Sequence, residues 1–436
     1  MVKKISNQIE AINAREILDS RGYPTLEVCL RLASGQRTKA SVPIGLHHNA
    51  RVKYLHDGDR RRFEGRGVLL AANHINELIA PRLLGMSVLE QEQIDRLLID
   101  LDSTDDRSQL GANTILAVSL VVARAAALSE GRELFAYLRD SFNLNTTDRL
   151  PTPLFNMFSG GSHADTNLDF KEFLLIPRPE SASFQASSRE GSMEKIVRAG
   201  AEVYHALAKI LISAGYDSDT GLEGGYSPDM DSSLKALDLI LAAITRAGYR
   251  VEEDFNLGLD IGSAQLYNKE DNQYIFTLDN LYFSATNLVS LYEEWLNKYP
   301  ITYLEDGLAA DDWPAWRQAT AALGDKLVLA GDDLFTSSIE RLRRGIAEQA
   351  ANAFVLKPNQ IGTLTETIEC AKLAQRQNYR LIVSHRGGET NDDFIVDLAV
   401  ALGAQFIKAG SLSRGERVAK YNRLTEIAMI INRLKK

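Results

Sequence analysis

The sequence predicts an α/β protein, with a small α+β domain over residues 1–140 followed by a β/α barrel over residues 150–436. At 436 residues, the chain is too long for one ordinary core. Its first part alternates in polarity as strands do, and helical patterns follow. Beyond about residue 150, short aliphatic runs recur between amphipathic segments. That recurrence is typical of parallel βα units.

The N-terminal region begins with strand-like alternation from Ile5 to about Lys39, around a DSRGYP turn. Apolar residues then recur at helical spacing over residues 67–84, 88–101 and 111–138. Strands followed by helices predict an α+β domain. The polar stretch over residues 143–153 is the expected linker.

Seven aliphatic runs predict the barrel strands, namely FLLIP, LGLDIG, ITYLEDG, LVLAGDD, AFVLKP, RLIVSHR and FIKAG. Six of them end in a charged or titratable residue, mostly about 25 residues apart, which is roughly one βα unit. Solvated strand ends would explain one or two such residues but not six. Because the carboxyl ends of barrel strands converge on one mouth, we expect these residues to share a site: Asp260, Glu305, Asp332, Lys357, His385 and Lys408.

Composition excludes several classes of partner. The net charge of −9 and the pI near 5.5 argue against nucleic acid or an anionic membrane. Two cysteines in separate apolar runs, Cys29 and Cys370, make no disulfide framework and are expected to be buried thiols. The N-terminus lacks the apolar core of a signal peptide, and no run of about 18 apolar residues is evident. A cytoplasmic location is therefore expected.

Three carboxylates on neighbouring strands, Asp260, Glu305 and Asp332, offer hard oxygen ligands suited to Mg²⁺ or Mn²⁺. Pairing with Lys357 or Lys408 is the alternative way to offset their repulsion. A lysine beside a metal and a second cation can lose its proton near neutral pH and act as a base.

Nine segments resemble, in order, the signatures of the enolase (phosphopyruvate hydratase) family across nearly the whole chain. They are AREILDSRGYPTLEV, GANTILAVSLVVARAAA, GGSHADTNLDFKEF, EGGYSP, LEDGLAADDW, GDDLF, LKPNQIGTLTET, SHRGGET and RVAKYN. The resemblance implies an enolase-superfamily barrel whose first strands are antiparallel. This reversal explains why Glu172 opens its strand while the other site residues close theirs.

The resemblance also implies the roles of the site residues in converting 2-phosphoglycerate to phosphoenolpyruvate. Lys357 would remove the C2 proton, and Glu223, assisted by Glu172, would protonate the departing C3 hydroxyl. Mg²⁺ would bind Asp260, Glu305 and Asp332. The substrate would contact His163, His385, Arg386 and Lys408, with Arg386 on the phosphate and Lys408 on the carboxylate. Lys171 is a further candidate substrate contact that departs from the family pattern; it would meet a substrate anion or pair with Glu172. A homo-oligomer, a dimer or an octamer, is also implied.

The sequence departs from the family pattern around the substrate. In VPIGLHHNARV, Ile44 replaces the serine that binds a second Mg²⁺, so one metal site is expected and the second is weakened, although the backbone carbonyl remains. His47 and His48 fit either a ligand contact or an exposed loop. Three further replacements lie near the site: Lys171 for glutamine, Leu222 for aspartate and Gly387 for serine.

Two functions remain open at this point. The first is a divergent paralogue with lyase activity on 2-phosphoglycerate or a related phosphorylated or phosphonate carboxylate, because Lys357 and Glu223 are retained. The alternative is a non-catalytic binding or scaffold protein that keeps the enolase fold.

Overall fold

The computed structural model describes residues 7–45, 52–187 and 190–434, which divide into two compact units. Unit 1 consists of the described residues of 1–149, 356–373 and 386–403. Unit 2 consists of those of 150–355, 374–385 and 404–436. Each unit is described by itself.

An antiparallel sheet in the order β1 (Ile9–Leu18), β2 (Pro24–Leu32), β3 (Arg37–Ser41) begins unit 1. The strand expected from Ile5 is observed from Ile9, and Ile5 itself lies outside the described residues. In the β1–β2 turn, the Asp19 carboxylate accepts hydrogen bonds from the backbone N–H groups of Arg21 and Tyr23. This side-chain bonding stabilises the tight turn that the DSRGYP segment predicts.

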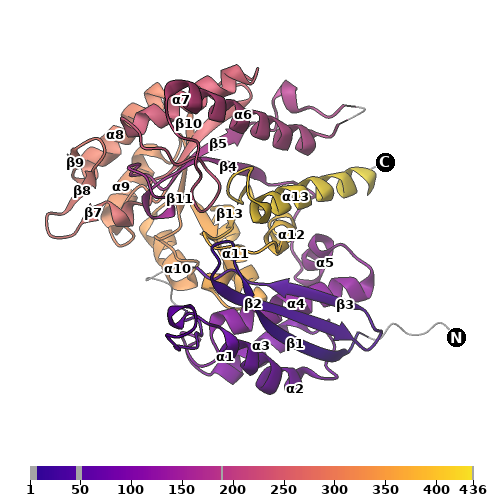
Figure 1. The fold of residues 1–436 in the computed structure, drawn as a ribbon. Helices are drawn as coiled ribbons and strands as arrows, with labels where there is room; N and C mark the ends of the chain where they lie inside the picture. Colours follow the sequence, from indigo (N-terminus) through magenta and orange to yellow (C-terminus); the bar gives the residue numbers. More distant parts are fainter. Residues whose placement is uncertain (1–6, 46–51, 188–189, 435–436) are drawn as a thin grey trace. The chain divides into compact units, whose positions relative to one another are not determined.

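Helices cover one face of this sheet, where α4 packs on β2 and β3 while α1 and α2 contact β1 (Figure 1). The helical elements of unit 1 up to residue 149 are η1 (Phe63–Gly65), α1 (Leu69–Asn73), the π-helix η2 (His74–Ile79), α2 (Ala80–Leu83), α3 (Gln91–Asp102), α4 (Ala112–Glu130) and α5 (Leu134–Ser141). The later segments add η6 (Pro358–Gln360), most of α11 (Leu364–Arg376) and α12 (Phe394–Ala401).

Helix α4 is long and apolar enough to cross a membrane by length and composition, but most of it is buried in the protein. One expectation for unit 1 needs correction. Cys29 is exposed, because alternation along β2 points it away from the helices, whereas Cys370 is buried as expected.

Unit 2 contains a closed eight-stranded barrel, which confirms the predicted fold class. Around the barrel, the strands are β4 (Thr152–Ser159), β5 (Glu172–Pro177), β6 (Phe255–Asp260), β10 (Ile301–Glu305), β11 (Val328–Gly331), β12 (Ala353–Leu356), β13 (Arg380–Ser384) and β14 (Phe406–Lys408). Strand β5 is antiparallel to both β4 and β6, whereas the β14–β4 and β6–β10 pairs are parallel. Strand β4 was not among the seven predicted runs, because it begins inside the expected linker.

Helices on the outside of the barrel include α6, α7 and α8, which contact β5 or β10 (Figure 1). The remaining elements of unit 2 are η3 (Gly161–His163), η4 (Ala182–Phe184), α6 (Ser192–Ala214), α7 (Ser233–Arg246), η5 (Ser263–Gln265), β7 (Tyr267–Asn268), β8 (Gln273–Phe276), β9 (Leu281–Phe283), α8 (Ala285–Lys298), α9 (Trp313–Leu323), α10 (Ile339–Glu348) and α13 (Gly415–Leu434). Four of these helices are capped by a side-chain oxygen that accepts from a first-turn N–H, namely α7, α8, α9 and α10.

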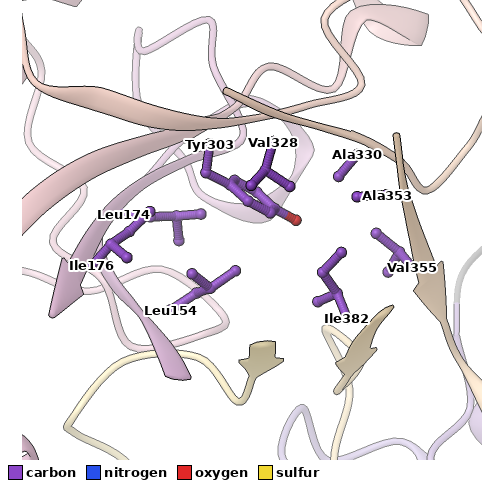
Figure 2. Close-up of a cluster of buried hydrophobic side chains, with 9 residues drawn as sticks. All are labelled: Leu154, Leu174, Ile176, Tyr303, Val328, Ala330, Ala353, Val355 and Ile382. Carbon is purple, nitrogen blue, oxygen red and sulfur yellow. The ribbon is translucent and has the colours of Figure 1, made fainter. Parts of the chain in front are cut away.

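The interior of the barrel is filled by side chains that point toward one another (Figure 2). They come from six of the eight strands: Leu154, Leu174, Ile176, Tyr303, Val328, Ala330, Ala353, Val355 and Ile382. Tyr303 is the one member with a polar atom. This packed layer fixes the strand ends, and with them the polar residues that follow.

Replacing Leu174 by Ala should lower the free energy of unfolding by about 2–5 kcal/mol, because it leaves a cavity in this layer. Urea unfolding followed by tryptophan fluorescence measures the change. Ile212→Ala on α6 is the control, since Ile212 is 63% exposed and its loss should change stability by less than about 0.5 kcal/mol. Equal effects of the two substitutions would contradict the packing argument.

Candidate active site

Three predicted metal ligands lie at the carboxyl ends of adjacent barrel strands. Asp260 ends β6, Glu305 ends β10, and Asp332 directly follows β11. Asp260 and Glu305 are register partners in the parallel β6–β10 pair. All three side chains are fully buried. The barrel therefore brings together the carboxylates that the strand pattern predicts.

The oxygens of these residues form two overlapping groups whose ligand atoms lie within 4.8 Å of one another: Asp260, Glu305 and Asp306, and then Asp306, Asp332 and Asp333. Among the described residues, no hydrogen-bond partner is found for Asp260 Oδ1 or Glu305 Oε1, although both atoms are buried. Buried carboxylate oxygens with no donor are costly unless a cation binds them. A hard divalent ion such as Mg²⁺ fits this set of donors.

Asp306 is a member of both groups that the sequence analysis did not single out. Its two carboxylate oxygens accept the backbone N–H groups of Asp332 at 3.0 Å and Asp333 at 2.8 Å. Burial and the neighbouring carboxylates raise the pKa of Asp306 well above its ordinary value. The sequence signal that could have identified Asp306 is its place in the LEDG segment, directly after Glu305. Asp306 ties the end of β10 to the residues that follow β11.

Two lysines supply positive charge to the carboxylates. The Nζ of Lys408, at the end of β14, contacts oxygens of Glu172 at 2.5 Å, Asp260 at 2.9 Å and Glu305 at 3.0 Å. The Nζ of Lys171 lies 3.4 Å from Asp260 Oδ2 and 3.7 Å from Asp332 Oδ2. Burial opposes the charge of both ammonium groups, but the carboxylates outweigh it and raise the pKa of each lysine well above its ordinary value.

Glu305 is also linked to the barrel interior. Residues two apart on a strand share a face, and the hydroxyl of Tyr303 donates to Glu305 Oε2 at 2.5 Å. Burial and the Asp260 charge raise the pKa of Glu305 to about 7, against the opposing effect of Lys408. Tyr303 was not predicted as a site residue, because in the sequence it reads only as part of an apolar run.

The expected acid, Glu223, lies beside Glu172 in a second polar cluster. Asn156 Nδ2 donates to Glu172 Oε1 at 2.9 Å and to Glu223 Oε2 at 3.5 Å. His163 Nδ1 is 3.1 Å from Glu223 Oε1, and His385 Nε2 is 3.7 Å from Glu223 Oε2. The structure thus gathers the two carboxyl groups that the resemblance placed at the leaving hydroxyl and two histidines that it placed in the substrate pocket.

The pKa values of Glu172 and Glu223 are shifted in opposite directions. Burial raises the pKa of Glu172 well above its ordinary value, and the nearby Glu223 adds to the rise although Lys408 opposes it. Burial disfavours the charge of Glu223 too, but His163, His385 and the bond from Glu172 outweigh it and lower the pKa of Glu223 well below its ordinary value. One proton shared between the two carboxyl groups accounts for both shifts.

Arg417 on α13 orients His385 and was missed by the sequence analysis, although it lies in the quoted RVAKYN segment. Its guanidinium is fully buried and donates to His385 Nδ1 at 2.5 Å. Burial lowers the pKa of His385 well below its ordinary value, so the ring is neutral. With Nδ1 accepting from Arg417, the ring proton belongs on Nε2, facing Glu223. Arg417 Nη2 also donates to the carbonyl of Leu222, adjacent to Glu223.

Two predicted residues, Lys357 and Arg386, belong to unit 1. Lys357 directly follows β12 and is buried. Arg386 donates through Nη1 to Asn359 Oδ1 at 3.1 Å and stacks so closely on Gly45 that a Cβ there would lie 1.9 Å from Arg386 Nη2. Burial lowers the pKa of Arg386 to about 9, with Arg21 adding to the effect and Glu389 opposing it.

Ile44 is buried, and its backbone carbonyl accepts a hydrogen bond from Arg21 Nη2 at 2.7 Å. The carbonyl that the sequence left as a candidate ligand for a second Mg²⁺ is thus next to a guanidinium, which disfavours a cation. His47 and His48 lie outside the described residues.

The raised pKa of Glu305 leads to a prediction for protein stripped of divalent ions with EDTA. Relative to wild type, Glu305→Gln should gain stability as pH rises from about 5 to about 8, by on the order of 3 kcal/mol. The folded wild type holds the Glu305 proton up to about pH 7, against an ordinary pKa of 4.5, so its stability falls across this window. Gln carries no such proton. Thermal unfolding at several pH values measures the difference. Glu293→Gln, at an exposed residue, is the control and should show no pH-dependent change relative to wild type. The same pH dependence of stability in wild type and Glu305→Gln would contradict the prediction.

Residues 9–138 match the family described as "Enolase, N-terminal domain", and residues 147–433 match "Enolase, C-terminal TIM barrel domain". Two curated proteins called "Enolase 2", from Pseudomonas syringae pv. syringae (strain B728a) and pv. tomato (strain ATCC BAA-871 / DC3000), are each 45% identical over 425 residues. These alignments cover 97% of this chain and 96% of each relative. The chain therefore belongs to the enolase family.

Proposed function

We propose that this protein is a metal-dependent carbon–oxygen lyase that removes a proton next to a carboxylate and eliminates water. The observation that carries the proposal is the buried carboxylate cluster, in which Asp260 and Glu305 keep oxygens without donors among the described residues. Enolase-family membership supports the same reaction class. The proposed ligands of one Mg²⁺ are Asp260, Glu305 and Asp332.

The proposed base is Lys357, whose Nζ would take the proton from C2 of the substrate. The electron pair of the C2–H bond then forms the C2–C3 double bond as the C3–O bond breaks. The leaving hydroxide takes the proton shared by Glu172 and Glu223 and forms water. When bound, Mg²⁺ would stabilise the negative charge that builds on the substrate carboxylate. Arg417 would keep the Nε2–H of His385 directed at Glu223 throughout.

A phosphorylated carboxylate is the proposed substrate class. Two guanidinium groups in unit 1 approach the backbone of Ile44 and Gly45: that of Arg386, which is buried, and that of Arg21, which also pairs with Asp19 at 2.7 Å. The Arg386 guanidinium in particular favours an anion. 2-Phosphoglycerate, giving phosphoenolpyruvate, is the first substrate to test. Related phosphorylated or phosphonate carboxylates follow, because Ile44, Lys171 and Gly387 change the side chains around the substrate. A cytoplasmic location and a homodimer or octamer remain predictions.

Lys357→Ala should reduce turnover of 2-phosphoglycerate by at least about 10²–10⁴-fold, because it removes the proposed base. The rise in enolpyruvate absorbance at saturating Mg²⁺ measures the rate. The control Lys326→Ala removes an exposed lysine paired at 4.0 Å with Glu293 and should leave the rate unchanged. If Lys357→Ala matched wild type on every substrate that the wild type turns over, Lys357 would not be the base.

Asp332→Ala should weaken Mg²⁺ binding at least about 100-fold, since loss of a residue that merely supports a metal ligand already costs about 10–100-fold. Isothermal titration calorimetry measures the affinity, and the exposed Asp311→Ala is the control. A scaffold protein without a metal requirement predicts identical titrations for wild type and Asp332→Ala. That result would favour the non-catalytic alternative.

A further inference from the structure

Lys171 occupies a fixed position at the start of the reversed strand β5. Its carbonyl accepts the Gly160 N–H at 3.0 Å, which holds the backbone against the end of β4. Its aliphatic stem packs on Gly262, where a Cβ would lie 3.2 Å from Lys171 Cβ and 3.3 Å from its Cδ. Gly262 also has a φ of +61°, so a larger residue there is disfavoured twice. The packing directs the side chain toward the carboxylates that end β6 and follow β11.

The ammonium group bridges two of the three proposed metal ligands. It lies 3.4 Å from Asp260 Oδ2 and 3.7 Å from Asp332 Oδ2, while the Lys171 side chain is only 8% exposed. Asp260 and Asp332 fall in different groups of close ligand atoms, and the Lys171 ammonium contacts one member of each group. A divalent ion that binds both carboxylates would meet this ammonium at short range, where water cannot screen the repulsion.

We propose that Lys171 is a built-in cation that competes with the divalent ion for Asp260 and Asp332 and thereby sets the metal affinity of the site. The Lys171 ammonium contacts one oxygen of each of these residues, and a metal ion must displace it from these oxygens to bind all three ligands. Lys171 is thus a positioning residue for the metal. The inference rests on the proposed function in one respect, that the site binds a divalent ion.

Replacing Lys171 should have opposite effects on metal affinity and on intrinsic stability. Without the ammonium, repulsion between the ligand and the divalent ion falls, so binding tightens. The carboxylates also lose a counter-charge, so protein in EDTA becomes less stable and regains more stability on metal addition. A purely structural lysine predicts the loss of stability without the gain in affinity.

The test is Mn²⁺ titration by electron paramagnetic resonance, repeated with Mg²⁺ by calorimetry, on wild type, Lys171→Gln, Lys171→Met and Lys171→Arg. Gln could offer its own oxygen to the metal, whereas Met offers none, so Met isolates the effect of charge. Both neutral variants should bind Mn²⁺ at least about tenfold more tightly than wild type. Lys171→Arg keeps the charge and should show no such gain. The exposed Lys326→Gln should bind as wild type does.

The outcomes separate this inference from the proposed function. No Mn²⁺ binding by wild type or by any variant would overturn the proposed function and, with it, the competition. Binding by wild type with equal or weaker binding by the folded Gln and Met variants would overturn the role of Lys171 alone. Thermal unfolding with EDTA and then with saturating Mn²⁺ verifies that each variant folds, and a larger Mn²⁺-dependent rise in the midpoint for Gln and Met supports the inference.

Discussion

The contact of one ammonium group, that of Lys408, with carboxylates from three strands is the interaction on which the site depends. Burying several carboxylates together costs several kcal/mol per charge unless cations and donors surround them. Lys408 at the end of β14 reaches Glu172, Asp260 and Glu305 on β5, β6 and β10. Barrel closure brings these strands within reach of one side chain. The closed barrel is therefore what allows Lys408 to offset the charge of the carboxylates in the site.

The hydrophobic interior also acts on the chemistry of the site. Tyr303 packs in the apolar layer and donates from that layer to Glu305. Arg417, buried on an outer helix, fixes the proton position of His385. Both residues act through a neighbour: one adds a donor to a proposed ligand, and the other selects a tautomer. The strand ends thus supply the proposed metal ligands, whereas the barrel core and helix α13 supply the residues that support the site side chains.

The sequence predicted the architecture and the strand-end positions of several candidate site residues, because both follow from chain periodicity. Repeating βα units place their polar ends at one mouth, so Asp260, Glu305, Asp332 and Lys408 could be assigned from spacing. Spacing does not fix which groups pair across the barrel, so Asp306 and the contacts of Lys171 were not predicted. The proton shared by Glu172 and Glu223 depends on the field of every nearby charge, which a linear pattern does not contain. Strand β4 was missed because a polar segment precedes it.

The reversal of β5 has a consequence for how such a site can diverge. In a wholly parallel barrel, the mouth is formed by the carboxyl ends of the strands and the residues that follow them, and these residues carry the ligands themselves. The antiparallel strand adds a segment that enters, and residue 171 lies at that entry while the proposed ligands lie on other strands. A single codon at this position can alter the electrostatics of the cluster while every ligand stays in place. Metal affinity can therefore change in a lineage without passing through a variant that has lost its acid, its base or its fold.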